Sequence, residues 1–148
     1  FLTVGSMGHC SSIALGVALS KNNRKIICID GDGSMLMHMG GLGTISSLQP
    51  KNYKYILLNN EAHESVGGQN TAAKNNDLSK IIAAFGFKTV VKAHNKNDLE
   101  KNLKKIINNN ELSFIEVLIQ PGSRSDLGRP TISPVKNKIS FMNFLKDD

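Results

Sequence analysis

The stretch Ile29-Asp30-Gly31-Asp32-Gly33-Ser34 decides the fold of this chain. Residues 25–29 before it are apolar and rich in β-branched side chains, which is typical of a buried parallel strand. The run ends in Gly-Asp-Gly, where small residues let a ligand approach the backbone and its N–H groups. A helical pattern opens at Ser34. The stretch therefore predicts a strand, a tight turn and a helix, with a ligand site at the turn.

A second strand, predicted over residues 53–58, ends in the pair Asn59-Asn60. The 25 residues from 34 to 58 lie between Gly33 and this pair, which suits one helical crossover. Because such crossovers are right-handed, both strand ends meet at the same edge of the sheet. Asp32 and the two asparagines would then offer carboxylate and carboxamide oxygens, which suit Mg²⁺ or Ca²⁺ holding a phosphate.

Strands and helices alternate along the rest of the chain, and no internal repeat is present. Ser11 or Ser12 is expected to cap the helix at about 11–20, and Asp98 the helix at about 98–109. Gly86 is expected to end the helix at about 77–85. The alternation predicts one domain, residues 1–148, of α/β class: a doubly wound, mostly parallel sheet with helices on both faces. The expected strands are 25–30, 53–58, 87–92 and 113–119, and the expected helices are about 11–20, 34–47, 77–85, 98–109 and 140–145.

Composition excludes several classes of protein. Of the 148 residues, 40% are hydrophobic and 20% charged, and no apolar run approaches the length of a membrane span. Residues 1–5 lack a Met and a signal-peptide layout, so we expect the middle of a longer chain or one subunit of a split protein. Cys10 and Cys28 have neither metal nor redox spacing, and buried free thiols suit a reducing cytoplasm.

The net charge of +6 does not indicate a nucleic-acid partner. The lysines are dispersed among asparagines, as on solvated helix faces and loops, and no stacking aromatic residues are interleaved with them. A positive field instead favours a small anionic substrate.

The pattern of Gly-Asp-Gly, about 25 residues and Asn-Asn resembles the thiamine-diphosphate-binding motif of thiamine-dependent enzymes. Longer stretches narrow the resemblance to the C-terminal, diphosphate-binding half of the phosphonopyruvate decarboxylases, with the sulfopyruvate decarboxylases as nearest relatives. It runs from the first residues almost to the last, and NNxAHxSVGGQ-T and LGRP are its most specific parts. The stretches are VGSMGHCSSIALGVALS, CIDGDGSMLMHMGGLGTI, LLNNEAHESVGGQNT and GSRSDLGRPTISPVKNKISFMNFL.

The resemblance implies thiamine diphosphate and Mg²⁺ as cofactors. Asp32, the side-chain oxygen of Asn60 and the backbone carbonyl of Ala62 would bind the metal, with diphosphate oxygens and a water completing an octahedron. Gly31 and the N–H groups of Gly33 and Ser34, with the Ser34 hydroxyl, would lie against the diphosphate. The alternative for Asp32 is a helix N-cap, and for the two asparagines a turn; the spacing of the motif favours the metal site.

Other cofactor contacts are implied on either side of the metal motif. Met7, in the loop with Gly5 and Ser6, matches the bulky apolar residue that bends the cofactor; the alternative is a core methionine beside a glycine turn. His63 is a candidate catalytic residue that handles a proton or contacts substrate, with Glu64 beside it; a loop histidine bonded to backbone is equally plausible. Weaker candidates are Gln69, Thr71, Arg124 and Arg129.

The family resemblance also implies that half of the site is elsewhere. Thiamine enzymes of this type use a glutamate from a pyrimidine-binding domain, and no segment here looks like that domain. A partner domain or subunit, in a homo- or hetero-oligomer, would supply it. The expected reaction is decarboxylation of 3-phosphonopyruvate to phosphonoacetaldehyde. The alternatives are a sulfopyruvate decarboxylase subunit, another 2-oxoacid decarboxylase, or a non-catalytic subunit that holds the cofactor. A nucleotide-binding domain is not favoured, because such a domain would need a G-x-G-x-x-G after a strand and the sequence has none.

Overall fold

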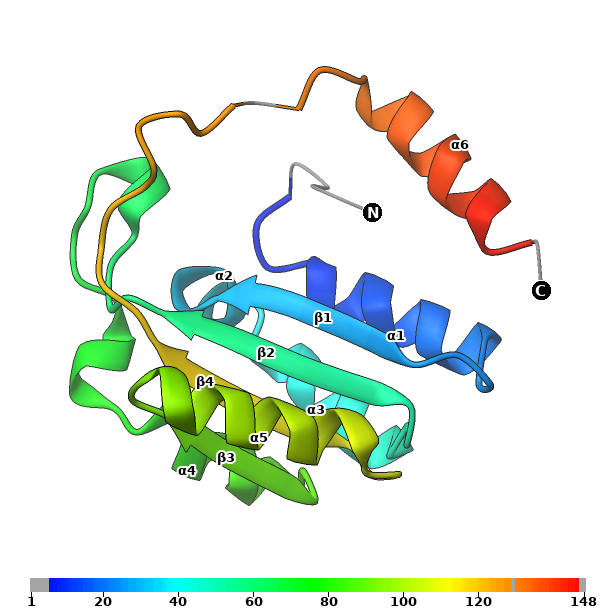
Figure 1. The fold of residues 1–148 in the computed structure, drawn as a ribbon, viewed down its shortest axis with the longest axis horizontal. Coiled ribbons are helices and arrows are strands. Elements are labelled where there is room, and N and C mark those ends of the chain that lie inside the picture. Colours follow the sequence, from blue (N-terminus) through cyan, green and yellow to red (C-terminus); the bar gives the residue numbers. More distant parts are fainter. Residues whose placement is uncertain (1–5, 129, 147–148) are drawn as a thin grey trace.

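Four parallel strands form the centre of the computed structural model, which describes residues 6–128 and 130–146 (Figure 1). Their order across the sheet is β1-β2-β4-β3. Each pair of neighbours is parallel, and the connections between them carry helices. The α/β sheet predicted from sequence is confirmed. The strands are β1 (Ile26–Gly31), β2 (Tyr53–Asn59), β3 (Thr89–Ala93) and β4 (Ser113–Leu118).

Helices cover both faces of the sheet, as predicted. Helices α1 (Cys10–Ser20), α3 (Gly40–Leu48) and α4 (Leu78–Phe85) share one face, and α5 (Lys96–Asn108) lies on the other (Figure 1). The larger core lies under α1, α3 and α4 and is built around aromatic strand residues. The smaller core lies under α5, around Ile106 and Ile115. Burial of these apolar faces is the main force that holds the helices to the sheet.

Two predicted helix starts differ from the structure. Helix α1 begins at Cys10 without a side-chain cap, and Ser11 is buried rather than capping. Helix α5 begins at Lys96, because the Asn95 side chain accepts a hydrogen bond from the Asp98 N–H and is the cap. The predicted end of α4 is confirmed, since Gly86 follows it with a left-handed φ of 102°.

The single helix predicted over 34–47 is two helices in the structure. Helix α2 (Asp32–Met37) ends at His38, and α3 begins at Gly40. Glycines are poor helix formers, and a pair of them begins α3 where the single helix was expected to continue. The loop before α1 packs against the break between α2 and α3. Gly8 of this loop lies so close to His38 that an added Cβ would clash with the His38 ring.

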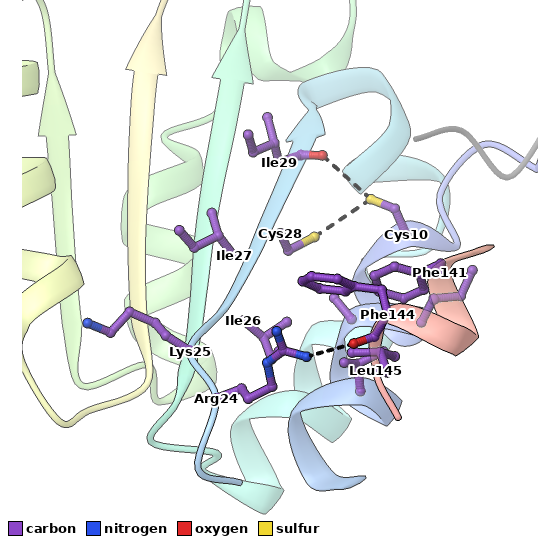
Figure 2. Close-up of a pocket in the computed structure, with 13 residues that line it drawn as sticks. Cys10, Arg24, Lys25, Ile26, Ile27, Cys28, Ile29, Phe141, Phe144 and Leu145 are labelled. Carbon is purple, nitrogen blue, oxygen red and sulfur yellow. Dashed lines mark hydrogen bonds between the residues drawn. The ribbon is translucent and has the colours of Figure 1, made fainter. Parts of the chain in front are cut away.

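The last helix is longer than predicted, and it lies beside α1. Helix α6 (Pro134–Phe144) replaces the predicted 140–145, because Ser133 accepts a hydrogen bond from the Lys136 N–H and Pro134 follows it. Ser-Pro is a recognised helix start, and it was the available signal. Figure 2 shows Phe141 and Phe144 of α6, and Leu145 just after it, beside the edge of β1, around a cavity of about 580 Å³.

Strand β1 is an edge of the sheet in the described part of the chain, where it pairs only with β2. Ile27 and Ile29 on it are 45% and 60% exposed, although parallel strands are usually buried on both faces.

Cys10 and Cys28 are free thiols, as predicted, with their sulfur atoms 3.7 Å apart (Figure 2). Within the described residues, no helix is both long and apolar enough to cross a membrane.

Candidate functional site

A cavity of about 240 Å³ lies where β1 and β2 end. Residues from the Gly-Asp-Gly turn, the Asn-Asn segment and the loop before α1 meet there, as the crossover argument predicted. Of the main predicted site residues in the described part of the chain, all but Ser6 line the cavity, whereas the weaker candidates Gln69, Thr71 and Arg124 do not. Its lining is Met7, Gly31, Asp32, Gly33, Ser34, Leu58, Asn60, Ala62, His63, Glu64, Ser65 and Ile119.

Asp32 follows β1 directly and is 2% exposed. Its Oδ2 atom accepts a hydrogen bond from the Thr71 hydroxyl. Asp32 also lines the cavity. A largely buried carboxylate that a hydroxyl holds through one oxygen is suited to binding a cation through the other.

The carboxamide of Asn60 has a fixed orientation. Its Nδ2 donates to Glu64 Oε2 at 2.7 Å, and its Oδ1 accepts from the Ala62 N–H at 3.1 Å. The oxygen is therefore the atom directed toward Ala62. A carboxamide oxygen has two lone pairs, so Oδ1 keeps one acceptor position for a metal ion.

Glu64 links the Asn-Asn segment to the chain after β4. While Oε2 holds Asn60, Oε1 accepts a hydrogen bond from the Gly122 N–H. Glu64 was predicted to contact the cofactor. The structure places it in the cavity lining with both carboxylate oxygens already engaged by protein.

The polar segment 59–76 contains a short hairpin. His63 N–H donates to the Gln69 carbonyl at 2.8 Å, and Thr71 N–H donates to the Glu61 carbonyl at 2.9 Å. Gly67 and Gly68 make the turn with φ of 129° and 77°, a backbone conformation that glycine adopts readily. The hairpin carries Thr71 back to Asp32.

His63 packs directly on the Gly-Asp-Gly turn. A Cβ at Gly33 would lie 2.6 Å from His63 Nδ1, so only glycine leaves room for the imidazole at this position. The ring is partly buried and lines the cavity. His63 can therefore hold a proton beside whatever occupies the cavity.

The loop before α1 is tied to the first turn of α2. Gly8 N–H donates to the Ser34 hydroxyl oxygen at 2.9 Å, which leaves the Ser34 O–H free to donate. Met7 is 37% exposed at the cavity. Ser6 lies outside the cavity, with its hydroxyl 3.0 Å from His9 Nδ1. Gly5, whose carbonyl was a predicted contact, lies outside the described residues.

Sequence reasoning missed a buried polar group behind the cavity. Glu116 on β4 is hydrogen-bonded to Asn59 and forms an ion pair with Lys92 on β3. Burial by itself would lower the pKa of Lys92, but the hydrogen bond and charge of Glu116, together with those of Asp77, outweigh burial and leave that pKa raised. A glutamate within an otherwise apolar strand was the available signal.

The arginines of the C-terminal segment do not line the cavity. Arg124 is exposed and pairs with Asp126 at 3.3 Å. Arg129 lies outside the described residues. Arg124 is therefore a solvated surface charge and not part of the cavity.

The oxygen donors at the cavity fit a hard divalent cation. In the described part of the chain, no three His, Cys, Asp or Glu side chains gather as a metal site. A cation here would instead use one carboxylate, one carboxamide and one peptide carbonyl, from Asp32, Asn60 and Ala62. Such oxygen ligands suit Mg²⁺, which keeps further positions for phosphate and water.

A family model described as "Thiamine pyrophosphate enzyme, C-terminal TPP binding domain" matches residues 2–117. The chain belongs to this family. The match spans the Gly-Asp-Gly turn, the Asn-Asn segment and all four strands. The predicted resemblance to thiamine-diphosphate-binding domains is confirmed.

Relatives with assigned activities support the narrower resemblance. The chain is 35% identical to phosphonopyruvate decarboxylase of Streptomyces viridochromogenes, over 98% of this chain and 36% of the relative. It is 37% identical to sulfopyruvate decarboxylase subunit beta of Methanocaldococcus jannaschii, over 99% of this chain and 77% of the relative. The chain therefore spans about a third of one relative and most of the other. Both families named from sequence are confirmed as relatives.

Solved structures confirm the fold. Benzoylformate decarboxylase from Polynucleobacter necessarius superposes with a TM-score of 0.71 at 20% identity, over 81% of this chain and 25% of that chain. At this identity the likeness concerns the fold alone.

Proposed function

We propose that this chain supplies the diphosphate-binding and metal-binding half of the active site of a decarboxylase that acts on 3-phosphonopyruvate. The observation that carries the proposal is the meeting of Asp32, Asn60 and Ala62 at one cavity, in a chain of the TPP-binding family. Asp32 and the Asn60 carboxamide would bind Mg²⁺ together with the Ala62 carbonyl. The metal would hold the diphosphate of thiamine diphosphate.

The remaining cavity residues have proposed roles toward the same group. Gly31 lets the backbone come close, and the N–H groups of Gly33 and Ser34 lie in the first turn of α2, where no helix carbonyl accepts from them. The Ser34 O–H keeps its proton to donate. Met7 presents an exposed apolar side chain that would pack against the cofactor and set its shape.

The chemistry of the reaction belongs to the cofactor. Bound thiamine diphosphate supplies an electron sink for the pair released when the C1–C2 bond of the 2-oxoacid breaks. Carbon dioxide leaves, one proton is added to the former carbonyl carbon, and phosphonoacetaldehyde results. His63 is proposed to hold or deliver a proton at its imidazole, which lies against the Gly-Asp-Gly turn.

A pyrimidine-binding domain or subunit is a necessary part of this proposal. The cavity of about 240 Å³ is smaller than the ~300–1,000 Å³ of complete ligand sites, which suits a site shared with another domain. We propose a homo- or hetero-oligomer, because this chain spans only part of the length of its relatives. A reducing cytoplasm is the proposed location, since the neighbouring Cys10 and Cys28 are free thiols.

Sulfopyruvate decarboxylation is the second candidate function. It is favoured by the 37% identity to a sulfopyruvate decarboxylase subunit, because the match extends over 77% of the length of that subunit. Both substrates are 2-oxoacids with an anionic group on C3, and the net positive charge of the chain suits both.

The test compares substrates in the full-length protein or assembly that contains this chain. With Mg²⁺ and thiamine diphosphate, release of CO₂ is measured from phosphonopyruvate, sulfopyruvate and pyruvate. We expect the largest kcat/KM for phosphonopyruvate; a larger value for sulfopyruvate moves the assignment to the second candidate. Asp32→Ala should abolish Mg²⁺-dependent cofactor binding in calorimetry. Unchanged binding would refute the metal site.

A further inference from the structure

Glu116 is a buried carboxylate that touches none of the proposed ligands. It lies on β4, is 1% exposed, and is flanked by partners from three other elements. Its Oε1 accepts from Asn59 Nδ2 at 2.8 Å. Its Oε2 accepts from Lys92 Nζ at 3.0 Å and from the Ser79 hydroxyl. Burying a charge is costly unless it is paired and hydrogen-bonded, and here every partner is supplied.

Asn59 carries this arrangement to the cavity. It is the last residue of β2, and its Oδ1 accepts from the Glu61 N–H at 3.0 Å. An ionised carboxylate only accepts hydrogen bonds. Glu116 therefore requires Asn59 to turn its NH₂ inward and its oxygen toward the Glu61 N–H. The charge of Glu116 fixes which end of the carboxamide faces the turn.

The turn that Asn59 holds has a backbone conformation that needs support. Glu61 has a φ of 57°, in the left-handed region that non-glycine residues rarely adopt. Such a conformation persists only when the surrounding structure holds it. Glu61 stands between Asn60 and Ala62, the two proposed metal ligands on this segment.

We propose that Glu116 is a positioning residue for the metal site: through Asn59, it holds the turn at Glu61 and so places the oxygens of Asn60 and Ala62. The proposal rests on the metal site proposed above. Glu116 contacts neither metal nor substrate. Its effect is on the affinity for Mg²⁺, because a misplaced oxygen ligand weakens binding.

An exchange of chemical groups tests the proposal in the full-length protein or assembly. Asn59→Asp alone places two carboxylates against each other. Combined with Glu116→Gln, it restores every contact, with donor and acceptor exchanged only between positions 59 and 116. The NH₂ of the introduced amide on β4 donates to the introduced carboxylate on β2, and the amide oxygen accepts from Lys92 and Ser79. The second oxygen of the introduced carboxylate still accepts from the Glu61 N–H.

The measurement is the Kd for Mg²⁺ by calorimetry at saturating thiamine diphosphate, with urea unfolding of each variant alongside. We expect Asn59→Asp and Glu116→Gln each to raise the Kd about 10- to 100-fold. The double variant should return it to within about tenfold of wild type. Ile106→Val is the control: it loosens the core under α5 without contact to this network, and should leave the Kd unchanged.

Three results would overturn the proposal. In the first, the single variants lose stability while the Kd for Mg²⁺ stays at the wild-type value, so the role is structural. In the second, the double variant binds Mg²⁺ as poorly as Asn59→Asp. If Asn59→Asp does not fold, Glu116→Gln alone tests the proposal, and an unchanged Kd for Mg²⁺ in that variant contradicts it. In the third, wild-type protein does not bind Mg²⁺ with thiamine diphosphate, and the proposed function fails with it.

Discussion

The Thr71 hydroxyl donates a hydrogen bond to the Asp32 carboxylate across 39 residues of sequence. Thr71 is brought there by the hairpin of residues 61–63 and 69–71, which also carries Ala62 and His63. One bond thus joins the Gly-Asp-Gly turn to the segment that follows Asn59-Asn60. The two halves of the candidate metal site are held together before any cation binds.

Removing the Thr71 hydroxyl should weaken the fold at this junction. Thr71→Val keeps the side-chain shape but leaves the buried Asp32 carboxylate without its donor. Hydrogen bonds to charged groups contribute about 1.5–3 kcal/mol, so we expect a loss of that size in the free energy of unfolding, measured by urea denaturation. Thr71→Ser restores a hydroxyl and should recover most of the loss. Equal losses in both variants would contradict this account.

Two glycines of the same turn should respond differently to an added methyl group. A Cβ at Gly33 meets His63 Nδ1 at 2.6 Å, whereas a Cβ at Gly31 has nothing within 4 Å. Gly33→Ala should therefore displace the imidazole and cost about 1–3 kcal/mol in urea denaturation. Gly31→Ala should change the unfolding free energy little. Similar stabilities for the two variants would show that His63 does not pack on Gly33.

Loss of the Glu64 carboxylate should loosen the chain after β4. Glu64→Ala removes the acceptor for the Gly122 N–H and the partner of Asn60. Because Glu64 is exposed to solvent, which weakens its hydrogen bonds, we expect a contribution of only about 0.5–1.5 kcal/mol, that is, roughly 2- to 13-fold faster amide exchange at Gly122 in hydrogen-exchange NMR.

Glu61→Gln is the matched control for that experiment. It removes a negative charge from the same segment, and no described residue bonds to the Glu61 side chain. Exchange at Gly122 should keep its wild-type rate in this variant. An increase as large as that of Glu64→Ala would mean that charge, and not the hydrogen bond, protects the amide.

Alkaline pH should unfold the protein through its buried tyrosines. Burial, together with the charge of Asp30, raises the pKa of Tyr55 well above its ordinary value. The unfolded chain releases this proton near pH 10 while the folded chain keeps it. Stability is therefore complete below about pH 10 and falls as pH rises above it, by about 1.4 kcal/mol per pH unit for this one group.

Tyr55→Phe isolates that contribution. The variant should be less stable at neutral pH, because Asp30 Oδ2 loses its hydroxyl donor. Above about pH 10, however, its unfolding free energy should fall less steeply than that of wild type, by one proton. Urea denaturation between neutral pH and about pH 11 measures both slopes. Parallel curves would contradict the burial of a neutral Tyr55 hydroxyl.

The strands and the meeting point of the site were predictable because they follow from local patterns and one handedness rule. Apolar runs placed β1 to within a residue or two at each end. The right-handed crossover brought Asp32 and Asn60 to one edge of the sheet. These inferences need only the order of the strands, which neighbouring segments of sequence largely determine.

The supports of the site were not predictable in the same way. Thr71 reaches Asp32 and Glu116 reaches Asn59 through contacts between distant segments, which no periodicity reports. The two-helix form of residues 32–48 depends on glycines whose propensity is only a weak guide. Ser133-Pro134, by contrast, was a local signal for the start of α6.

The exposed side chains of β1 bear on how this chain can be handled in solution. Ile27 and Ile29 are exposed on an edge strand, which pairs with no second strand on its outer side among the described residues. Unpaired, apolar strand edges are where chains associate and aggregate. Preparations of this segment by itself should precipitate as concentration rises, and co-expression with whatever covers β1 should keep it in solution.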